Sequence, residues 1–248
     1  MTTLNIVSLL PSLMNTNGDA ENATVLQRRA DWAGLDARVI PVDSPADLPG
    51  RVDAVVIGSG SDASLEAVRS KLLTIHDELR TWGTDGVPIL SVGTGWELLS
   101  WGIERRDGST VEGLGILPGR AVPRDGRVTG DVVVASPRFG LLVGFENHAR
   151  DYVGAEGSPL GRLRSGTGNG RGSGQEGVVM GAVIGTHLHG PVLAKNPEFA
   201  DHLLVSMAER AGLEYAAGPA AAVADAYATA ARETQLAAVG AAASVTEA

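Results

Sequence analysis

The segment Pro88 to Leu99 (PILSVGTGWELL) has the pattern of a buried strand that turns sharply into a helix. A turn of this kind exposes the residue at its apex and directs backbone N–H groups towards it, which is how several hydrolases present a nucleophile. Here the apex is Gly93, which has no side chain. Ordinary strand–turn–helix connections of α/β folds have the same pattern, so the segment fits both a reaction site and a structural link.

Two histidines, His187 and His189, stand two positions apart in the sequence GTHLHGP. On extended backbone this spacing places both imidazoles on one face, where they could share a metal ion. A protein zinc site has three or four ligands, and no third ligand is close in the sequence, so we predict no metal site. One histidine could instead act as a general base, and either could be a packing or surface residue.

A third polar group, Glu146, Asn147 and His148, ends an apolar strand pattern in the sequence GFENH. Carboxylate and imidazole side chains are suited to acid–base chemistry. Polar side chains at a strand end can also simply satisfy a turn. The residue types fit both interpretations.

The composition excludes several classes of protein. The 248 residues include no cysteine, which rules out disulfides, thiolate metal sites and a thiol nucleophile. The formal net charge is −9, which argues against a nucleic-acid binder with its basic contact surface. No run of about 18 consecutive apolar residues is present, and the N-terminus lacks the pattern of a signal peptide. We therefore expect no membrane span and a cytoplasmic location.

Short apolar runs alternate with helical patterns in the first hundred residues, which is typical of βαβ units and a parallel sheet. We predict that Leu4–Leu10, Asp53–Ile57 and Pro88–Val92 are neighbouring parallel strands. Ligands of open α/β sheets bind at the carboxyl edge, and Gly93 should lie at that edge. The other elements expected in this half are a strand at Ala37–Val42 and helices at Ala20–Trp32, Asp62–Trp82 and Trp96–Trp101.

Later in the chain, apolar runs at 132–135, 140–145 and 178–184 predict antiparallel strands at the sheet edge or in a small added sheet. The Gly/Ser/Arg-rich segment Arg162–Gly177 is expected to be a flexible surface loop. Pro197–Ala211 should be a helix that begins with proline. We predict a domain at 1–213 and an Ala-rich helical tail at 214–248, weakly docked because it lacks large apolar side chains.

The chain carries in order the segments GSGSD (58–62), PILSVGTGWELL (88–99), GLGILPG (113–119), RVTGDVV (127–133), GFENH (144–148), GTGNG (166–170) and THLHGPVLAKNPEFAD (186–201). Together they resemble the GatD family, the glutamine amidotransferase subunits of lipid II isoglutaminyl synthases, which are CobB/CobQ-like class I amidotransferases. The likeness runs from about Leu4 to Leu204. It implies a flavodoxin-like class I glutamine amidotransferase fold, with a parallel central sheet, antiparallel edge strands and flanking helices.

The resemblance also implies a function. In that family the subunit hydrolyses glutamine and passes ammonia to a Mur-ligase-like partner, MurT, which amidates the D-glutamate of lipid II in peptidoglycan synthesis; no cofactor is implied. A thiolate attacks the amide, a histidine moves the proton and backbone N–H groups hold the oxyanion. The resemblance assigns the histidine to His189, the glutamine-capturing arginine to Arg127 and the oxyanion donors to Gly60 and Thr94.

The chain departs from the family at the nucleophile, because the family's cysteine falls on Gly93. The family elbow is close to Cys-Gly-Gly-Tyr-Gln, whereas this chain has Gly93–Glu97 (GTGWE). The family's Gly-Gly-Gly-x-Asp turn is Gly58–Asp62 (GSGSD), and the Glu-Gln that follows it is Ser64-Leu65. We therefore expect impaired catalysis. Deliberate removal of one residue and sequence drift would both explain the loss, and the number of changes favours drift.

Three functions follow from these observations. The first is a GatD-like subunit bound to a MurT-like ligase. The second is a non-catalytic pseudoenzyme that stabilises or regulates a ligase, and the ligase then uses free ammonia. The third is a stand-alone small-molecule hydrolase in which His189 and Glu146 form an acid–base pair. In the first case, Glu97 also places a carboxylate near the elbow, where it would raise the pKa of any thiol introduced there.

Overall fold

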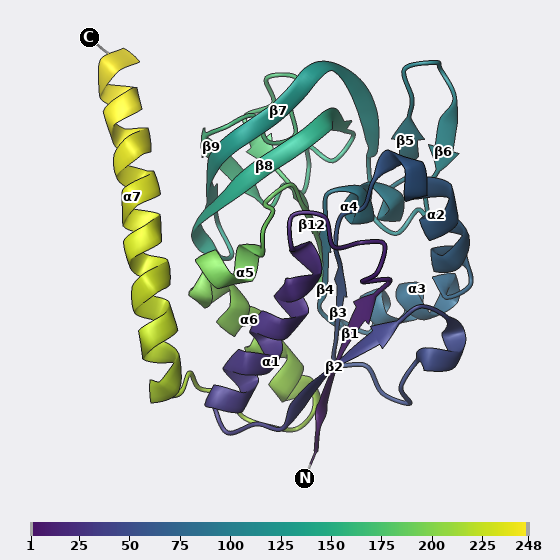
Figure 1. Cartoon of the computed structure of the whole chain (residues 1–248), viewed down its shortest axis with the longest axis vertical. Helices are drawn as coiled ribbons and strands as arrows, with labels where there is room; N and C mark the ends of the chain where they lie inside the picture. Colours follow the sequence, from purple (N-terminus) through teal and green to yellow (C-terminus); the bar gives the residue numbers. More distant parts are fainter. Residues whose placement is uncertain (1, 247–248) are drawn as a thin grey trace.

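The central layer of the molecule is a six-stranded sheet (Figure 1). The computed structural model describes residues 2–246, and the side chains of residues 2–240. The strands are β1 (Leu4–Leu9), β2 (Ala37–Val42), β3 (Ala54–Ile57), β4 (Ile89–Val92), β11 (Val178–Met180) and β12 (Val183–Thr186), in the spatial order β11-β12-β4-β3-β1-β2. All neighbours are parallel except β11, which pairs antiparallel with β12 at the edge. The predicted neighbours β1, β3 and β4 are confirmed.

Helices cover both faces of this sheet. They are α1 (Asn22–Trp32), α2 (Leu65–Leu73), α3 (His76–Thr84), α4 (Thr94–Leu99), α5 (Val192–Lys195) and α6 (Pro197–Arg210). In β3, Val55 and Ile57 belong to the apolar core shared with α2 and α3, while Ala54 and Val56 belong to the core shared with α1 and α6. Side chains alternate across a strand, so a strand covered on both faces must be apolar throughout. Figure 1 shows the two groups of helices on opposite sides of the sheet.

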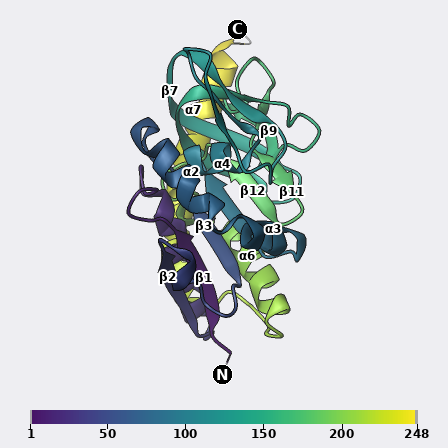
Figure 2. The same cartoon turned by 90° about the vertical axis from the view of Figure 1, so that its right-hand side faces the viewer.

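A second sheet lies beyond the carboxyl ends of β1, β3 and β4 (Figures 1 and 2). It consists of β5 (Gly102–Glu104), β6 (Thr110–Glu112), β7 (Arg120–Ser136), β8 (Gly140–Val153), β9 (Gly161–Ser165) and β10 (Gln175–Glu176). The long strands β7 and β8 pair antiparallel, with a register shift between Pro123 and Val128. The sequence left open whether these strands extend the central sheet or form a small added sheet, and the structure shows an added sheet. This sheet covers the carboxyl edge of the central sheet.

Two predicted elements are each divided in the structure. The helix expected at Asp62–Trp82 is two helices, because Ile75 has non-helical angles (φ −127°, ψ 24°) and its side chain is buried in the core. The strand expected at Val178–Ile184 is the hairpin of β11 and β12, which turns at Gly181 in the left-handed region (φ 62°). The helical periodicity continues across Ile75, and the apolar run continues across Gly181. The sequence pattern therefore did not reveal either break.

The segment Arg162–Gly177 is more ordered than its composition predicts. It contains most of β9 and all of β10, which pair with each other. The buried side chain of Asn169 accepts a hydrogen bond from the Gly177 N–H (2.7 Å) and donates one to the Gly177 carbonyl (3.1 Å). The buried amide thus joins the middle of the segment to its end, and the expectation of a loop throughout was wrong for residues 162–165 and 175–176, which are strands.

The C-terminal helix α7 (Ala222–Thr246) lies along the side of the molecule, in yellow in Figure 1. Polar contacts hold it there. Asp225 pairs with the buried Arg29 of α1 (2.5 Å), Arg232 donates to the Leu141 carbonyl (2.7 Å), and Gln235 donates to Asp131 (2.7 Å). Docking is therefore firmer than the scarcity of large apolar side chains suggests.

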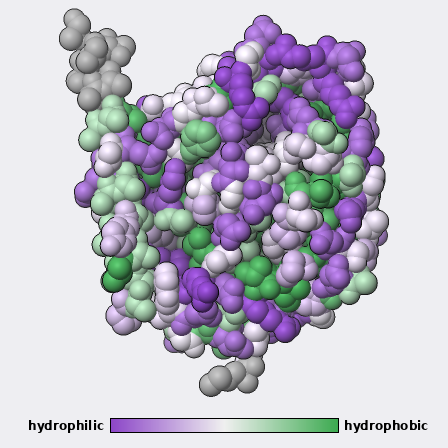
Figure 3. Space-filling view, viewed as in Figure 1, coloured by the Kyte–Doolittle hydropathy of each residue, from purple (hydrophilic) through white to green (hydrophobic). Residues whose placement is uncertain are grey.

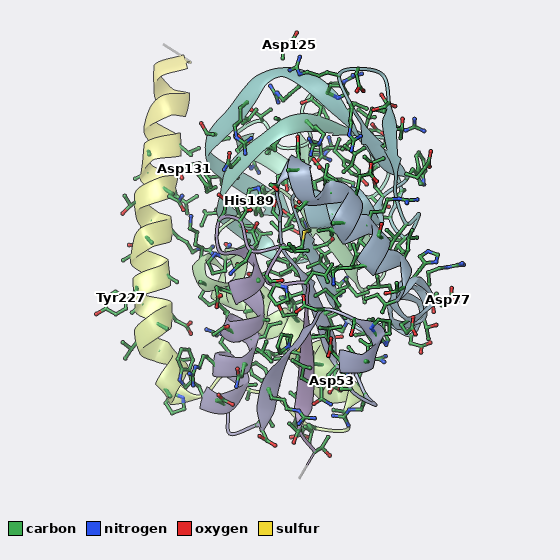
Figure 4. All side chains as sticks on the ribbon, turned by 45° about the vertical axis from the view of Figure 1, so that its right-hand side comes forward. Asp53, Asp77, Asp125, Asp131, His189 and Tyr227 are labelled. Carbon is green, nitrogen blue, oxygen red and sulfur yellow. The ribbon has the colours of Figure 1, made fainter. Side chains whose placement is uncertain are left out.

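The α7 helix carries mostly small side chains, and in Figure 3 it forms a band of mixed pale green and lilac along the side of the molecule. Tyr227 is 76% exposed and points away from the body of the molecule in Figure 4. Within residues 2–246, no helix combines the length and the apolar character that a bilayer crossing requires.

Candidate active site at the carboxyl edge of the central sheet

Gly93 forms a sharp turn between β4 and α4. Its backbone angles (φ 54°, ψ −123°) lie in a region that residues with a side chain rarely adopt, and that nucleophile elbows use to expose the apex residue. The Gly93 N–H bonds to the Thr186 carbonyl (2.9 Å), and the Glu97 N–H bonds to the Gly93 carbonyl (2.9 Å). The elbow geometry is therefore retained at a position without a side chain.

His189 lies directly beside this elbow. It comes from the loop after β12, and its Cε1 atom is 2.7 Å from the position that a Cβ atom on Gly93 would occupy. The labelled side chain in Figure 4 lies between the second sheet and the loops of the carboxyl edge. The structure thus brings together two predicted site residues that are 96 positions apart in the sequence.

Asp19 orients the His189 ring. Its Oδ2 lies 2.7 Å from His189 Nδ1, and its Oδ1 accepts a hydrogen bond from the Gly190 N–H (3.0 Å). Because a carboxylate only accepts, Nδ1 donates the proton of this contact, and Nε2 is the other ring nitrogen. This Nε2 is buried and has no hydrogen-bond partner. The sequence gives no sign of this role for Asp19, because the stretch Asn17–Asp19 (NGD) fits a simple turn.

The space above Gly93 is already filled. A Cβ atom there would lie 2.7 Å from Ser59 Oγ and 3.0 Å from Ser59 Cβ, in addition to the contact with His189. Separations below 3.0 Å are sterically forbidden for such pairs, so a side chain at position 93 would force its neighbours to move. Ser59 follows β3, in the turn that faces the elbow.

The two predicted oxyanion donors are both occupied within the chain. The Gly60 N–H donates to Thr94 Oγ1 at 2.6 Å, and the Thr94 N–H points at Ser59 Oγ at 3.4 Å. The two hydroxyl oxygens are 3.4 Å apart. Gly60 and Thr94 therefore both line the cavity beside Gly93, and their N–H groups face side-chain hydroxyls of the chain itself.

Arg127 reaches the same site from β7. Its side chain is exposed, and its guanidinium donates to the side-chain oxygen of Asn147 (2.6 Å) and to the Asn147 carbonyl (3.2 Å). Asn147 in turn donates to the side chain of Asn17 (3.1 Å). Arg127 is thus held at the rim by the second sheet, with donors left for a ligand.

These residues surround a cavity of about 400 Å³. This volume is within the range of small-molecule pockets. Among its lining residues are Gly60, Asp62, Gly93, Arg127, Arg150 and His189. No group of three or more possible metal-ligating side chains occurs within the described part of the chain.

An ion pair forms the cavity wall next to the elbow. Arg150 of β8 donates through Nε to Glu97 (3.0 Å) and through its two terminal nitrogens to Asp62 (2.7 and 3.1 Å). Burial by itself would raise the pKa of Glu97, but the charge of Arg150 and the nearby His187 overcome it and lower the pKa to about 2. The carboxylate is therefore ionised and its charge is balanced.

His187 lies beneath the cavity rather than in it. Its ring stacks on His148 (centroids 4.1 Å apart), and neither of its nitrogens has a hydrogen-bond partner. Burial and the proximity of His148 lower the pKa of His187 to about 3, so the ring is neutral. Of the two histidines in the sequence motif, only His189 lines the cavity.

Glu146 is not paired with His189. Its carboxylate accepts hydrogen bonds from the Thr167 and Gly168 N–H groups (2.8 Å each), it lies 3.5 Å from His148, and it is not among the cavity's lining residues. The acid–base pair of the hydrolase hypothesis is therefore absent. Ser91 is also excluded as a nucleophile, because it is buried and donates to the Ile184 carbonyl (2.9 Å).

Solved structures share this fold. A crystal structure of a glutamine amidotransferase superposes with a TM-score of 0.57 at 20% identity, covering 81% of this chain and 98% of the other. PurLQS from Thermotoga maritima gives 0.53 at 12% identity, covering 85% and 97%. At these identities the similarity establishes the fold, which is that of the class I glutamine amidotransferases.

Residues 5–197 match the family model of the CobB/CobQ-like glutamine amidotransferase domain. The GatD subunit of the glutamine-hydrolysing lipid II isoglutaminyl synthase of Staphylococcus aureus is 33% identical over 214 residues, which are 86% of this chain and 87% of that one. The corresponding subunit of Streptococcus pneumoniae is 30% identical over 208 residues, 82% and 80% of the two chains. The chain therefore belongs to the CobB/CobQ-like glutamine amidotransferases and, within them, to the GatD family.

Proposed function

We propose that this chain is the amidotransferase-type subunit of a lipid II isoglutaminyl synthase and binds a MurT-like ligase as a heterodimer. In such an enzyme, ammonia from glutamine amidates the D-glutamate of lipid II during peptidoglycan synthesis. The observation that carries the proposal is the contact of His189 with the Gly93 elbow, with Asp19 behind the ring. It sits at the edge where α/β sheets bind ligands.

Each site residue has a role in this proposal. Gly93 marks the position of the nucleophile, and His189 is the proton carrier, which Asp19 positions. Arg127 binds the carboxylate of glutamine, since its guanidinium reaches the cavity rim. The N–H groups of Gly60 and Thr94 are the ancestral oxyanion donors.

Glutamine hydrolysis is impaired in this proposal. No thiol exists in the chain, and the apex of the elbow has no side chain. The hydroxyls of Ser59 and Thr94 fill the space and bond to the N–H groups that the reaction would use. Loss of a nucleophile removes the covalent route and lowers the rate by several orders of magnitude.

A second candidate is a pseudoenzyme subunit that stabilises or regulates the ligase, which then uses free ammonia. The coordinated filling of the site by Ser59 and Thr94 favours it over a partly active enzyme. Both candidates require the same partner. Both also place the chain in the cytoplasm, where ATP and glutamine are available to the ligase.

The chain divides functionally in this scheme. Residues 1–213 form the amidotransferase-like domain and 214–248 a C-terminal extension. The family model ends at residue 197, and α7 begins 25 residues later, which supports this division.

Co-expression with a Mur-ligase-like protein from the same genome tests the proposal. We expect the two chains to co-elute at the mass of a heterodimer, and the complex to amidate lipid II when ammonium chloride is supplied. A complex that never forms, for any Mur-ligase-like protein of that genome, would contradict both candidates. Amidation by the ligase alone at the rate of the complex would contradict a stabilising or regulatory role.

A further inference from the structure

We propose that Ser59 and Thr94 close the active site, and that with Gly93 they form one coupled set that decides whether glutamine can react. The inference rests on the proposed function, because it concerns the same site. The family pattern has glycine, cysteine and glycine at positions 59, 93 and 94, and all three are changed here. One change removes a side chain, and the other two add hydroxyl groups.

Ser59 occupies the space that the loss of a side chain at position 93 leaves free. Its Oγ is 2.7 Å from the ideal Cβ position on Gly93, and the residue is only 6% exposed. Protein interiors are densely packed, so a vacated position next to an imidazole is filled by a neighbour or costs stability. The Ser59 side chain is the group that fills it.

Thr94 occupies the place of the substrate oxygen. Its Oγ1 accepts the Gly60 N–H at 2.6 Å, and also lies 3.3 Å from the Gly60 carbonyl. A donor that is preorganised for an oxyanion must be free when the substrate arrives. Here a covalently attached hydroxyl satisfies the donor permanently, so an amide carbonyl would have to displace it.

The three positions are coupled because no change at one of them restores a reactive site by itself. A Cβ at position 93 would meet the His189 ring, which cannot retreat because Asp19 holds it. It would also meet Ser59, whose Cβ is 3.0 Å away, so rotation of the hydroxyl would not relieve the contact completely. Removal of both hydroxyls without a thiol opens the site but supplies no nucleophile.

A four-variant cycle of the full-length chain tests the coupling: the parent, Gly93→Cys, Ser59→Gly/Thr94→Gly, and the triple variant. We expect Gly93→Cys to lower the melting temperature of the parent by roughly 5 °C through overpacking. In the Ser59→Gly/Thr94→Gly background the same substitution should lower it by less than half as much. Ser61→Gly, on the same turn but exposed, is the matched control and should not change the effect of Gly93→Cys.

Covalent labelling supplies the second readout. We expect 6-diazo-5-oxo-L-norleucine, a glutamine analogue that alkylates active-site thiols, to add one mass equivalent to the triple variant at least tenfold faster than to Gly93→Cys. His189→Ala in the triple variant should abolish this difference, because a thiol without a base remains protonated.

Three results would overturn the proposal. They are equal melting-temperature losses in both backgrounds, rapid labelling of Gly93→Cys alone, and modification of Ser59 itself by phenylmethanesulfonyl fluoride, which would make it a nucleophile. None of these measurements needs the ligase. If the coupling test fails but the heterodimer forms, the proposed function stands and only the coupling is contradicted. If the three positions are coupled but no heterodimer forms, only the proposed function is contradicted.

Discussion

The side chains of Asp19 and His189 are joined by a 2.7 Å contact between Oδ2 and Nδ1, and both are almost fully buried. The pair holds the imidazole with Cε1 beside Gly93, although the elbow there carries no nucleophile. A buried ionisable residue is costly unless it is hydrogen-bonded, and both oxygens of Asp19 have partners here. The orienting pair therefore also has a structural role.

Replacement of Asp19 should destabilise the protein. Asp19→Ala would leave the His189 Nδ1–H and the Gly190 N–H without acceptors, which should cost about 3 kcal/mol of unfolding free energy. Urea unfolding measures this. The fully exposed Asp125, labelled in Figure 4, provides the control, and Asp125→Ala should change the unfolding free energy by less than about 0.5 kcal/mol. Equal effects of the two substitutions would contradict the role of Asp19.

Acid should destabilise the fold in two steps. The folded pKa of His187, about 3, is below that of an exposed histidine, so the unfolded chain binds a proton more readily as the pH falls below about 6.5. The folded pKa of Glu97 is also depressed, to about 2. Glu97 therefore stabilises the folded state at pH values above the ordinary carboxyl pKa. This contribution to the free energy of unfolding is lost as the pH falls from about 4.5 to 2.

The first step can be isolated with His187→Leu. Unfolding free energies at pH 7.0 and 5.0 should differ less for this variant than for the parent, because leucine binds no proton. Burial raises the pKa of Glu176, so this residue changes the unfolding free energy in the opposite direction as the pH falls. It is present in both proteins, and the comparison between them cancels much of its effect. If parent and variant lose the same stability over this interval, His187 does not titrate as described.

Asp225 should control the docking of α7. Asp225→Ala removes one of the two carboxylates that bind the buried Arg29, the other being Asp201. We expect amide hydrogen exchange in residues 222–240 to become at least several-fold faster, while exchange in β1 stays unchanged. Glu233→Ala, an exposed substitution on the same helix, is the control and should leave exchange as in the parent. Unchanged protection in Asp225→Ala would mean that packing alone docks the helix.

The parallel half of the fold could be predicted from the sequence, because its signals are local. The apolar runs of β1, β3 and β4 and the glycine-rich turns after them predict both the strands and the edge where Gly93 lies. The position of His189 beside that edge came from the family motif and not from spacing. The breaks at Ile75 and Gly181 were missed because the core, rather than the local pattern, determines them.

The electrostatics of the site could not be predicted, because the partners come from distant segments. Glu97 was expected to be an uncompensated negative charge near the elbow. Arg150, which is 53 residues away in the sequence, donates to it at 3.0 Å and balances it. An introduced thiol at position 93 would therefore experience less repulsion than the sequence suggested, and Glu97→Gln would remove one of the two carboxylate charges that balance Arg150. Steric closure by Ser59 is the stronger obstacle.

Glutamine turnover by the chain and its complex shows whether the elbow at Gly93 is closed to reaction. The isolated chain and its complex with a MurT-like ligase would be incubated with glutamine labelled with ¹⁵N at the amide, and release of labelled ammonia would be measured alongside amidation of lipid II. We expect no ammonia release above the background without protein, and amidation only when ammonium chloride is added. Release of labelled ammonia at a rate that sustains amidation would contradict this expectation, and would show that the closed elbow still hydrolyses glutamine.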